Sequence, residues 1–289
     1  MAEIHEINPL IKEELLSIYQ AFASVCEKHQ LKHWVAFGTM LGAVRHHGFI
    51  PWDDDFDIFM LREDYEKFLS VADKELPEYF KLVTHRNCSA YPAIFGKIQE
   101  SRREVYEKIE SETDYINPHG LYIDIFPLDG MPSSWIEQKL DLLRYAVGYC
   151  RKKYLFRKGK HGSLAGAISR CAGWFMGLFL WKRKTENDFA FMLDLWVKKY
   201  PTTGCKFVRV GSLDARFQRK EYCFLREIFD DSEVVLFETI TVPVPKKWDA
   251  ALRTLYGDSY MTPPPVEKRV SEHSKSKKAP WYYGPKVEK

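Results

Sequence analysis

The sequence predicts an α+β fold, in which a mixed sheet is flanked by helices and carries an inserted helical subdomain. Short apolar runs of strand length alternate with amphipathic helical stretches up to Gly130, and strand-like runs resume near Val208. Between them, the pattern from Ser133 to Tyr200 is that of a long helical region. With 289 residues, 45% of them hydrophobic, the chain can bury one large core.

Helices outside that region are predicted from spacing and capping residues. A second helix is expected over Arg62–Ala72, and another over Lys247–Tyr256, which Gly257 closes. The first helix starts at Asn8 and Pro9, which suit a cap and a first helical position. Its apolar residues recur at helical spacing and are expected to cover the sheet: Ile11, Leu15, Ile18, Phe22 and Val25.

Strands are expected where short apolar runs lie between turn residues. The predicted strand regions are Trp34–Phe37, Pro51–Met60, Lys81–Thr84, Ala93–Ile98, Leu121–Phe126, a stretch near Val208, and Val234–Val244.

Composition excludes several classes of protein. The net charge of +3 is too small to indicate nucleic acid as a partner. The cysteines have no paired spacing, which argues against a zinc module or a disulfide framework and favours a reducing compartment. The N-terminus lacks the apolar core of a signal peptide, and no uncharged apolar run reaches the length of about 18 residues that a spanning helix needs. We expect a cytoplasmic protein, either free or attached to the inner face of the cell membrane.

The most informative feature is the run PWDDDFDIFM, Pro51–Met60, which sets aspartates among apolar and aromatic residues. In a strand, alternate side chains share a face, so Asp53, Asp55 and Asp57 would lie together, with Asp54 on the opposite face. Like charges on one face repel one another unless a hard divalent cation compensates them. The run therefore predicts a metal site, and the alternative is a solvated acidic loop.

A second chemical feature lies just upstream. The predicted order of strand, glycine turn and helix start over Trp34–Val44 is a geometry that points backbone N–H groups at an anion. Gly38 would let a phosphate approach the backbone, Thr39 would cap the helix, and Gly48 would end it. Arg45 lies where it can reach the phosphate, and the alternative for it is an ordinary solvent-facing charge.

These motifs resemble a known family. Gly38–Met60 is similar to the signature of the LicD family, phosphorylcholine transferases of the nucleotidyltransferase superfamily that are related to the fukutin-type proteins. Asp141–Phe229 matches the family only loosely. Further segments resemble its lysine-bearing strand, its second acidic strand and its C-terminal segment: Tyr91–Ile98, His119–Asp129 and Val242–Pro265.

The resemblance implies a nucleotidyltransferase-like fold and a division of the chain. It implies a catalytic core over residues 1–132, and a helical subdomain over 133–205 that faces either the membrane or the acceptor. Residues 206–269 would complete the core, and residues 270–289 would form a basic tail.

The resemblance also implies the site residues. Gly38 and Thr39 match the family's glycine–hydroxyl pair, Asp55 and Asp57 its alternating carboxylates, and Asp124 its third carboxylate on a neighbouring strand. The implied ligands of Mg²⁺ or Mn²⁺ are Asp53, Asp55, Asp57 and Asp124. From the residues alone, Asp124 is an acid in an apolar strand that needs a cation or a raised pKa, and the alternative is an ion pair with Arg or Lys.

The implied activity is transfer of phosphocholine from CDP-choline to a hydroxyl of teichoic acid, lipopolysaccharide or capsule, on a lipid-linked acceptor, with release of CMP. Asp124 would take the hydroxyl proton, while Lys97 and Arg45 would neutralise the leaving nucleotide phosphate. The alternatives are a nucleotidyltransferase that moves AMP or CMP from a nucleoside triphosphate, a CDP-alditol phosphotransferase, and a non-catalytic binding protein.

Two further features are open from the sequence. The segment Ser163–Trp181 is apolar with basic flanks, and it suits either a buried helix, which Arg170 favours, or a helix in a membrane interface. A choline head group requires an aromatic cage, although core packing is the alternative for every candidate. The candidates are Trp34, Trp52, Tyr122, Trp281, Tyr282 and Tyr283.

Overall fold

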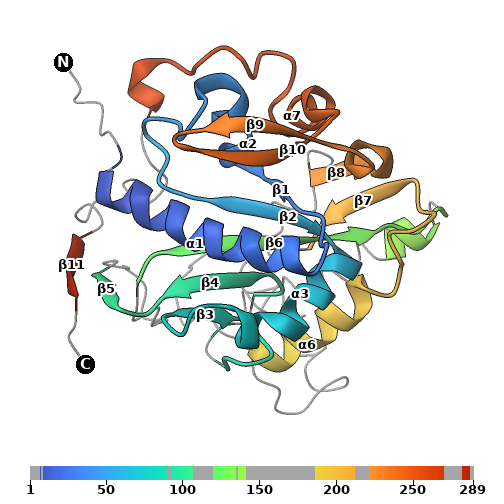
Figure 1. Cartoon of the computed structure of the whole chain (residues 1–289). Helices are drawn as coiled ribbons and strands as arrows, with labels where there is room; N and C mark the ends of the chain where they lie inside the picture. The colour runs from blue at the N-terminus through green and yellow to red at the C-terminus, as the bar shows by residue number, and fades with distance from the viewer. Residues whose placement is uncertain are drawn as a thin grey trace, which may run out of the picture.

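The computed structural model describes residues 7, 9–89, 91, 93–106, 120–134, 136–140, 186–211, 222–269 and 282–286. Within these ranges the chain forms a mixed sheet with helices packed against it, which confirms the predicted α+β fold (Figure 1). Residues 141–185, most of the predicted helical subdomain, lie outside the described part of the chain, so the division into domains stays a prediction.

The main sheet is built around β6, the longest of its strands. One edge of β6 pairs in parallel with β2, and β2 pairs with β1. The other edge pairs antiparallel with β4 and, toward the end of β6, with β7; β3 then follows β4, and β8 follows β7. The strands are β1 (Trp34–Val35), β2 (Asp57–Leu61), β3 (Phe80–Val83), β4 (Gly96–Glu100), β6 (Tyr122–Gly130), β7 (Phe207–Val210) and β8 (Cys223–Leu225).

Helices and smaller sheets surround this core. Helices α1 and α3 contact each other and β6, so they cover one face of the sheet, whereas α2 and α7 pack together near β1 and the β9–β10 hairpin (Figure 1). The elements are α1 (Pro9–Lys28), α2 (Phe37–His46), α3 (Arg62–Glu75), α6 (Glu186–Val197), α7 (Trp248–Tyr256), η3 (Arg226–Phe229), η4 (Val266–Lys268), β5 (Arg103–Tyr106), β9 (Ser232–Phe237), β10 (Ile240–Pro245) and β11 (Tyr282–Lys286).

The apolar stripe of the first helix is buried as predicted. Its side chains join one continuous core with Ile58 of β2 and Ile123 of β6. Burial of this stripe holds α1 across the sheet because each large apolar side chain taken out of water contributes about 1.5–3 kcal/mol. The predicted stripe residues that are buried are Ile11, Leu15, Ile18, Phe22 and Val25.

The predicted strand boundaries differ most at the aspartate run. The strand expected over Pro51–Met60 begins only at Asp57, so residues 53–56 lie in irregular backbone just before β2. Val234–Val244 contains a hairpin, with Glu238 at the turn in a left-handed conformation (φ 51°). The strand predicted over Leu121–Phe126 continues to Gly130, which brings Asp129 into the sheet.

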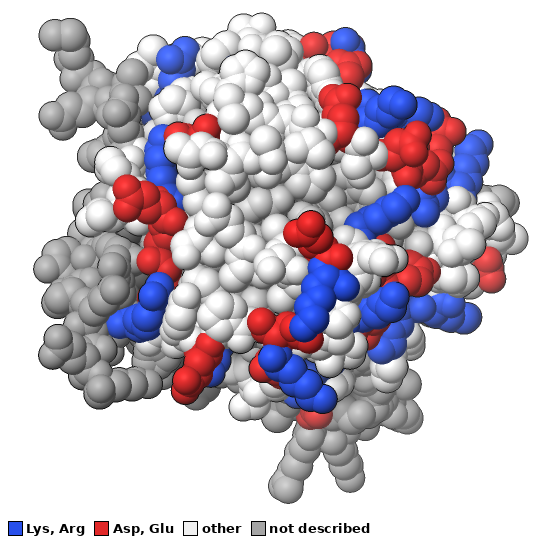
Figure 2. Space-filling model, viewed as in Figure 1, with Lys and Arg blue, Asp and Glu red and all other residues white. Residues whose placement is uncertain are grey.

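Charged side chains of both signs lie in small groups around an uncharged centre on the face shown in Figure 2. Several exposed charges are paired, for example Arg226 with Asp230 and Lys247 with Glu227. Nucleic-acid-binding proteins instead carry a continuous basic stripe. The described part of this face shows none, in agreement with the small net charge.

None of the described helices is both long enough and apolar enough to span a membrane. The segment Ser163–Trp181, for which the sequence leaves a buried and a membrane-interface helix open, lies outside the described residues.

Candidate active site

Three predicted site residues lie side by side across the centre of the sheet. The parallel pairing of β2 with β6 sets Asp57 opposite Asp124, and the antiparallel pairing of β4 with β6 sets Lys97 opposite Asp124. Opposed residues on neighbouring strands point to the same face. The result is a row of carboxylate, carboxylate and ammonium drawn from three separate parts of the chain.

Lys97 binds the neighbouring acid directly. Its Nζ lies 2.9 Å from Oδ1 of Asp124 and 3.3 Å from the centre of the Tyr122 ring. Asp124 therefore has an ion-pair partner in this structure. Lys97 also occupies a face of Tyr122, one of the aromatic rings considered for a choline head group.

A second group of carboxylates precedes β2. Asp53, Asp54 and Asp55 are half-buried, and each offers a ligand atom within 4.8 Å of those of the other two. The prediction that Asp54 lies on the opposite face is wrong because residues 53–56 are not a strand and so do not alternate. Grouped carboxylate oxygens are the ligands that Mg²⁺ and Mn²⁺ prefer.

The two groups of carboxylates act on each other. Burial raises the pKa of Asp57 well above its ordinary value, and the charges of Asp55, Asp124 and Asp53 raise it further, while Lys97 offsets part of the effect. A bound cation would reverse such a shift. The carboxylates of Asp53, Asp55, Asp57 and Asp124 therefore influence one another electrostatically, while the ligand atoms that lie within 4.8 Å of one another among the described residues are those of Asp53, Asp54 and Asp55.

The turn at Gly38 and Thr39 is hydrogen-bonded to Asp57. Helix α2 begins at Phe37, so Thr39 lies in its first turn and does not cap it, contrary to the prediction. The Thr39 hydroxyl instead accepts a hydrogen bond of 2.9 Å from the backbone N–H of Asp57. Gly48 was expected to end the helix, but His47 holds the left-handed position (φ 54°). Phe37 also has a positive φ of 42°, the kind of strained backbone that collects at functional sites.

Gly38 is required by a close approach. A Cβ atom at this position would lie 2.2 Å from Oδ2 of Asp53, a separation that would force the carboxylate to move. The absence of a side chain at Gly38 therefore sets where Asp53 sits, a role different from the predicted approach of a phosphate.

We expect Gly38→Ala to weaken Mn²⁺ binding by about tenfold or more, since displacing one ligand by a clash readily changes the binding energy by roughly 1.4 kcal/mol. The measurement is Mn²⁺ titration by calorimetry on the folded protein. Gly204→Ala is the control for a glycine variant remote from the aspartates in sequence, because a Cβ at this exposed turn would meet nothing within 4 Å. Equal Mn²⁺ affinity in both variants would show that Gly38 does not position a ligand.

Arg45 and Trp52 point toward the C-terminal part of the chain. Nη1 of Arg45 donates a hydrogen bond of 2.7 Å to the carbonyl of Tyr260, and its Nε donates one of 3.3 Å to Nδ1 of His46. The Trp52 ring lies edge-on to His46, with the guanidinium of Arg269 over its face at 5.2 Å. Both predicted donor-binding residues thus lie beside the segment that follows α7.

Tyr256, at the end of α7, belongs to the site although the sequence assigned it no role. Burial raises the pKa of its phenol, and the charges of Asp53 and Asp57 raise it further, while Arg45 lowers it. The phenol therefore senses the charges of the carboxylates and of Arg45. The signal was available, since Tyr256 lies in the segment that resembles the family's C-terminal region.

Other aromatic candidates lie elsewhere. Trp34 is fully buried, and its indole N–H donates a hydrogen bond of 2.9 Å to Ser232, so it belongs to the core. Tyr282 and Tyr283 lie in β11, which pairs with β5 in a separate small sheet. Trp281 lies outside the described residues.

Known proteins share this arrangement of motifs. A family model described as "LicD/FKTN/FKRP, nucleotidyltransferase domain" matches residues 30–157, which include every predicted site residue. The lipopolysaccharide cholinephosphotransferase LicD of Haemophilus influenzae is 27% identical over 264 residues, 89% of this chain and 92% of that protein. The chain resembles LicD over most of its length, and residues 30–157 match the domain model.

Other relatives match shorter stretches of the chain. An uncharacterised protein of Rickettsia typhi is 40% identical over 74 residues, 25% of this chain and 23% of that protein. One of Rickettsia prowazekii is 47% identical over 55 residues, 18% of this chain and 21% of that protein.

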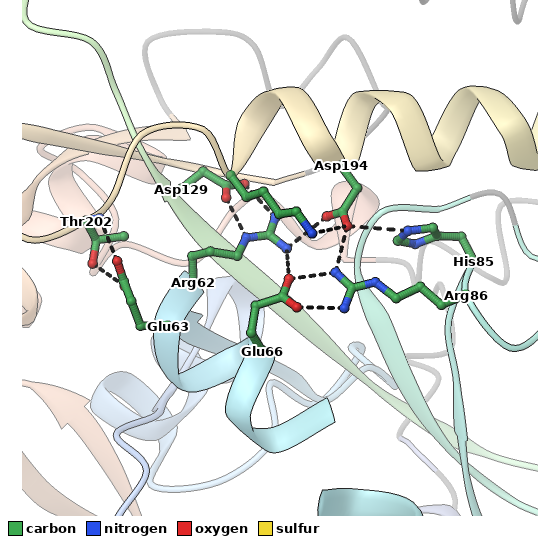
Figure 3. A network of polar contacts seen from close by, with 9 residues as sticks. Arg62, Glu63, Glu66, His85, Arg86, Asp129, Asp194 and Thr202 are labelled. Carbon is green, nitrogen blue, oxygen red and sulfur yellow. Dashed lines mark hydrogen bonds and ion pairs between the residues drawn. The ribbon is translucent and has the colours of Figure 1, made fainter. Parts of the chain in front are cut away.

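At the far end of β2 and β6, the chain buries a charge network around Arg62 (Figure 3). Nε and Nη2 of Arg62 bind the two oxygens of Asp129 at 2.6 and 2.9 Å, and Nη1 binds Asp194 at 2.9 Å. Asp194 lies on α6, where Arg86 also reaches it at 2.6 Å. Burial opposes ionisation of Asp194, but the neighbouring His85, 3.5 Å away, and the charges of Arg62 and Arg86 lower its pKa below the ordinary value. The network fastens α6 to the sheet.

Proposed function

We propose that this protein is a metal-dependent transferase that moves phosphocholine from CDP-choline to a hydroxyl of a cell-surface glycan and releases CMP. The observation that carries the proposal is the row of Asp57, Asp124 and Lys97, next to the grouped carboxylates of Asp53 and Asp55. The similarity to the Haemophilus influenzae protein, a lipopolysaccharide cholinephosphotransferase, supports the same reaction. A lipid-linked lipopolysaccharide, teichoic acid or capsular glycan is the acceptor class that we infer.

The residues that would hold Mg²⁺ or Mn²⁺ are Asp53, Asp55, Asp57 and Asp124. Their oxygens fit a hard ion, and the raised pKa of Asp57 reflects repulsion that a cation relieves. When bound, such an ion withdraws charge from phosphate oxygens and acidifies the acceptor hydroxyl.

The chain's own groups have separate tasks in this reaction. Asp124 accepts the proton of the acceptor hydroxyl, because it lies on the strand beside Asp57 and within the same carboxylate unit. Lys97 holds a positive charge 2.9 Å from Asp124, where negative charge develops on the departing CMP phosphate. Thr39 fixes the backbone of Asp57, so the row is already arranged before the substrate binds.

The decisive experiment supplies purified protein with CDP-choline, Mg²⁺ and a panel of lipopolysaccharide, teichoic acid and capsular glycans. We expect CMP and choline-bearing glycan to form together, excess EDTA to stop the reaction, and Mn²⁺ to restore it. Full turnover in EDTA would contradict the metal-dependent mechanism. Release of pyrophosphate from a nucleoside triphosphate, with no CMP from CDP-choline, would replace the proposal with a nucleotidyltransferase.

The donor head group is tested in the same assay by comparing CDP-choline with CDP-glycerol. A desolvated contact between a quaternary ammonium and an aromatic ring is worth about 2 kcal/mol, which corresponds to a preference of roughly 30-fold for CDP-choline. The sequence offers Trp52, Tyr122 and Trp281–Tyr283 for this contact. Equal use of the two donors would remove choline from the proposal and favour a CDP-alditol phosphotransferase.

A further inference from the structure

A group of basic side chains surrounds Trp52, next to the carboxylates. Arg45 and His46 lie at the end of α2, and Arg269 directly follows η4. The Arg269 guanidinium lies over the Trp52 ring at 5.2 Å, and the His46 ring meets the same indole edge-on at 6.2 Å. Two distant parts of the chain therefore place their positive charges at one spot.

These arginines lack the carboxylate partners that other arginines have. Arg62, Arg86 and Arg253 each form ion pairs, whereas no ion pair in the described part of the chain includes Arg45 or Arg269. Burial lowers the pKa of Arg45, which Tyr256 partly offsets, and the charge of Arg269 lowers it further. Like charges brought together without a counter-ion favour the binding of an anion.

The two guanidinium groups are held in place with nitrogen atoms to spare. Arg45 donates to the carbonyl of Tyr260 at 2.7 Å, and Nε of Arg269 donates to the carbonyl of Pro264 at 2.8 Å. The terminal nitrogens of Arg269 make no hydrogen bond within the described residues, so its outer edge keeps a pair of parallel donors. Such a fork matches two oxygens of a phosphate.

Tyr256 connects this basic group with the metal-binding carboxylates. Its phenol is influenced by Asp53 and Asp57 on one side and by Arg45 on the other. Trp52, whose ring lies under Arg269, also directly precedes Asp53, so the basic group lies next to the grouped carboxylates.

We propose that Arg45 and Arg269 together bind the phosphate of the donor nucleotide, and that Trp52 is a positioning residue that holds Arg269 by a cation–π contact. This inference rests on the proposed function for the identity of the nucleotide. It assigns Arg269 a binding role and gives Trp52 a task other than contact with the choline head group. The same arginines hold the CMP phosphate after transfer.

The test measures binding of CMP by calorimetry, which requires no turnover. We expect Arg269→Gln to weaken CMP about 10- to 100-fold, the usual range for loss of charge-assisted hydrogen bonds. Arg253→Gln, an exposed arginine of α7 whose ion pairs are with Asp249 and Asp258, is the matched control and should bind CMP like the parent protein. Thermal melting verifies that each variant is folded, and Arg269→Lys, which keeps the charge but loses the planar fork, should lie between the two.

The positioning role of Trp52 is tested with a double-mutant cycle between Trp52 and Arg269. Trp52→Leu should lower the CMP affinity, and the double variant with Arg269→Gln should lose little more, because both changes remove the same interaction. Trp52→Phe keeps a ring under the guanidinium and should retain most of the affinity. Loss of the preference for CDP-choline over CDP-glycerol in Trp52→Leu, with CMP binding unchanged, would overturn the positioning role.

The KM values of the donor and of the acceptor show whether the phosphate that Arg269 binds belongs to the nucleotide or to the glycan. We expect Arg269→Gln to raise KM for CDP-choline and CDP-glycerol alike and to leave KM for the glycan unchanged. A raised KM for a phosphorylated glycan with unchanged CMP affinity would overturn the proposal in favour of an acceptor phosphate. If the protein binds CMP through Arg269 yet transfers no phosphocholine, the proposed function is wrong, while the binding of the nucleotide phosphate by Arg45 and Arg269 is confirmed.

Discussion

Asp57→Asn is expected to reduce transfer by at least about 1000-fold, because the change removes one of the proposed metal ligands and several kcal/mol of charge stabilisation. The same variant should melt at a higher temperature than the parent protein in EDTA. Asp57 lies among Asp55, Asp124 and Asp53, whose charges raise its pKa together with burial. Neutralising it relieves that repulsion when no cation is present.

The pH dependence of this gain has a defined sign. A carboxyl whose folded pKa lies above its unfolded value destabilises the fold once the pH exceeds the unfolded value, here near 3.8. The difference in melting temperature between Asp57→Asn and the parent should therefore be near zero at about pH 3–4 and should widen as the pH rises. Scanning fluorimetry in EDTA across this range measures it.

The control for both readouts is Asp230→Asn, since Asp230 is an exposed partner of Arg226 far from the carboxylate unit in the fold. We expect it to leave turnover and the pH profile unchanged, and Asp124→Asn to match the loss in Asp57→Asn. Asp54→Asn is a poor control because its carboxylate groups with Asp53 and Asp55. Normal turnover in Asp57→Asn would eliminate the metal site from the mechanism.

Arg62→Met should have the largest effect on stability. It would leave Asp129, which is fully buried, without its bidentate partner, and Asp194 without one of its arginines. Removing one member of a buried ion pair destabilises a protein by about 3–5 kcal/mol. At roughly 2–4 °C per kcal/mol for a chain of this size class, the melting temperature should fall by about 10 °C.

Urea denaturation of Arg62→Met measures this loss, and Arg253→Met, at an exposed arginine of α7, is the control in which we expect little change. Adding Asp129→Asn should recover part of the stability, because it removes the orphaned charge. Turnover per folded molecule should stay near that of the parent, since Arg62 lies at the opposite end of the paired strands from Asp57. A stability equal to that of the control would mean that the network does not fasten α6.

The sequence predicts the elements of the fold better than their contacts. The first helix has the predicted buried face because helical spacing is a local property. The predicted start of β2 was wrong because a strand forms only where a neighbouring strand pairs with it. Trp34 and Val35 pair only with Phe59 and Ile58, and β6 reaches back only to Asp57, so nothing continues the ladder before that residue.

For the candidate site too, the individual residues were easier to predict from the sequence than the contacts between them. The resemblance named Asp57, Asp124 and Lys97 separately, but their common row depends on the register of three strands, which no local pattern encodes. Arg269 and Tyr256 were not found because each looks like an ordinary residue at the end of a helical segment. Their roles arise from how the chain after α7 returns to α2.

The pairing of β2 with β6 limits which amino-acid substitutions this protein can tolerate. One five-residue ladder has Asp57 and Asp124 at its first rung, and Arg62 and Asp129 directly follow its last rung, Leu61 and Leu128. A slip of one residue would turn Asp57 to the wrong face and also separate the buried charges. Substitutions that preserve stability thus also preserve the spacing of Asp57 and Asp124, so variation in acceptor preference must accumulate outside this ladder.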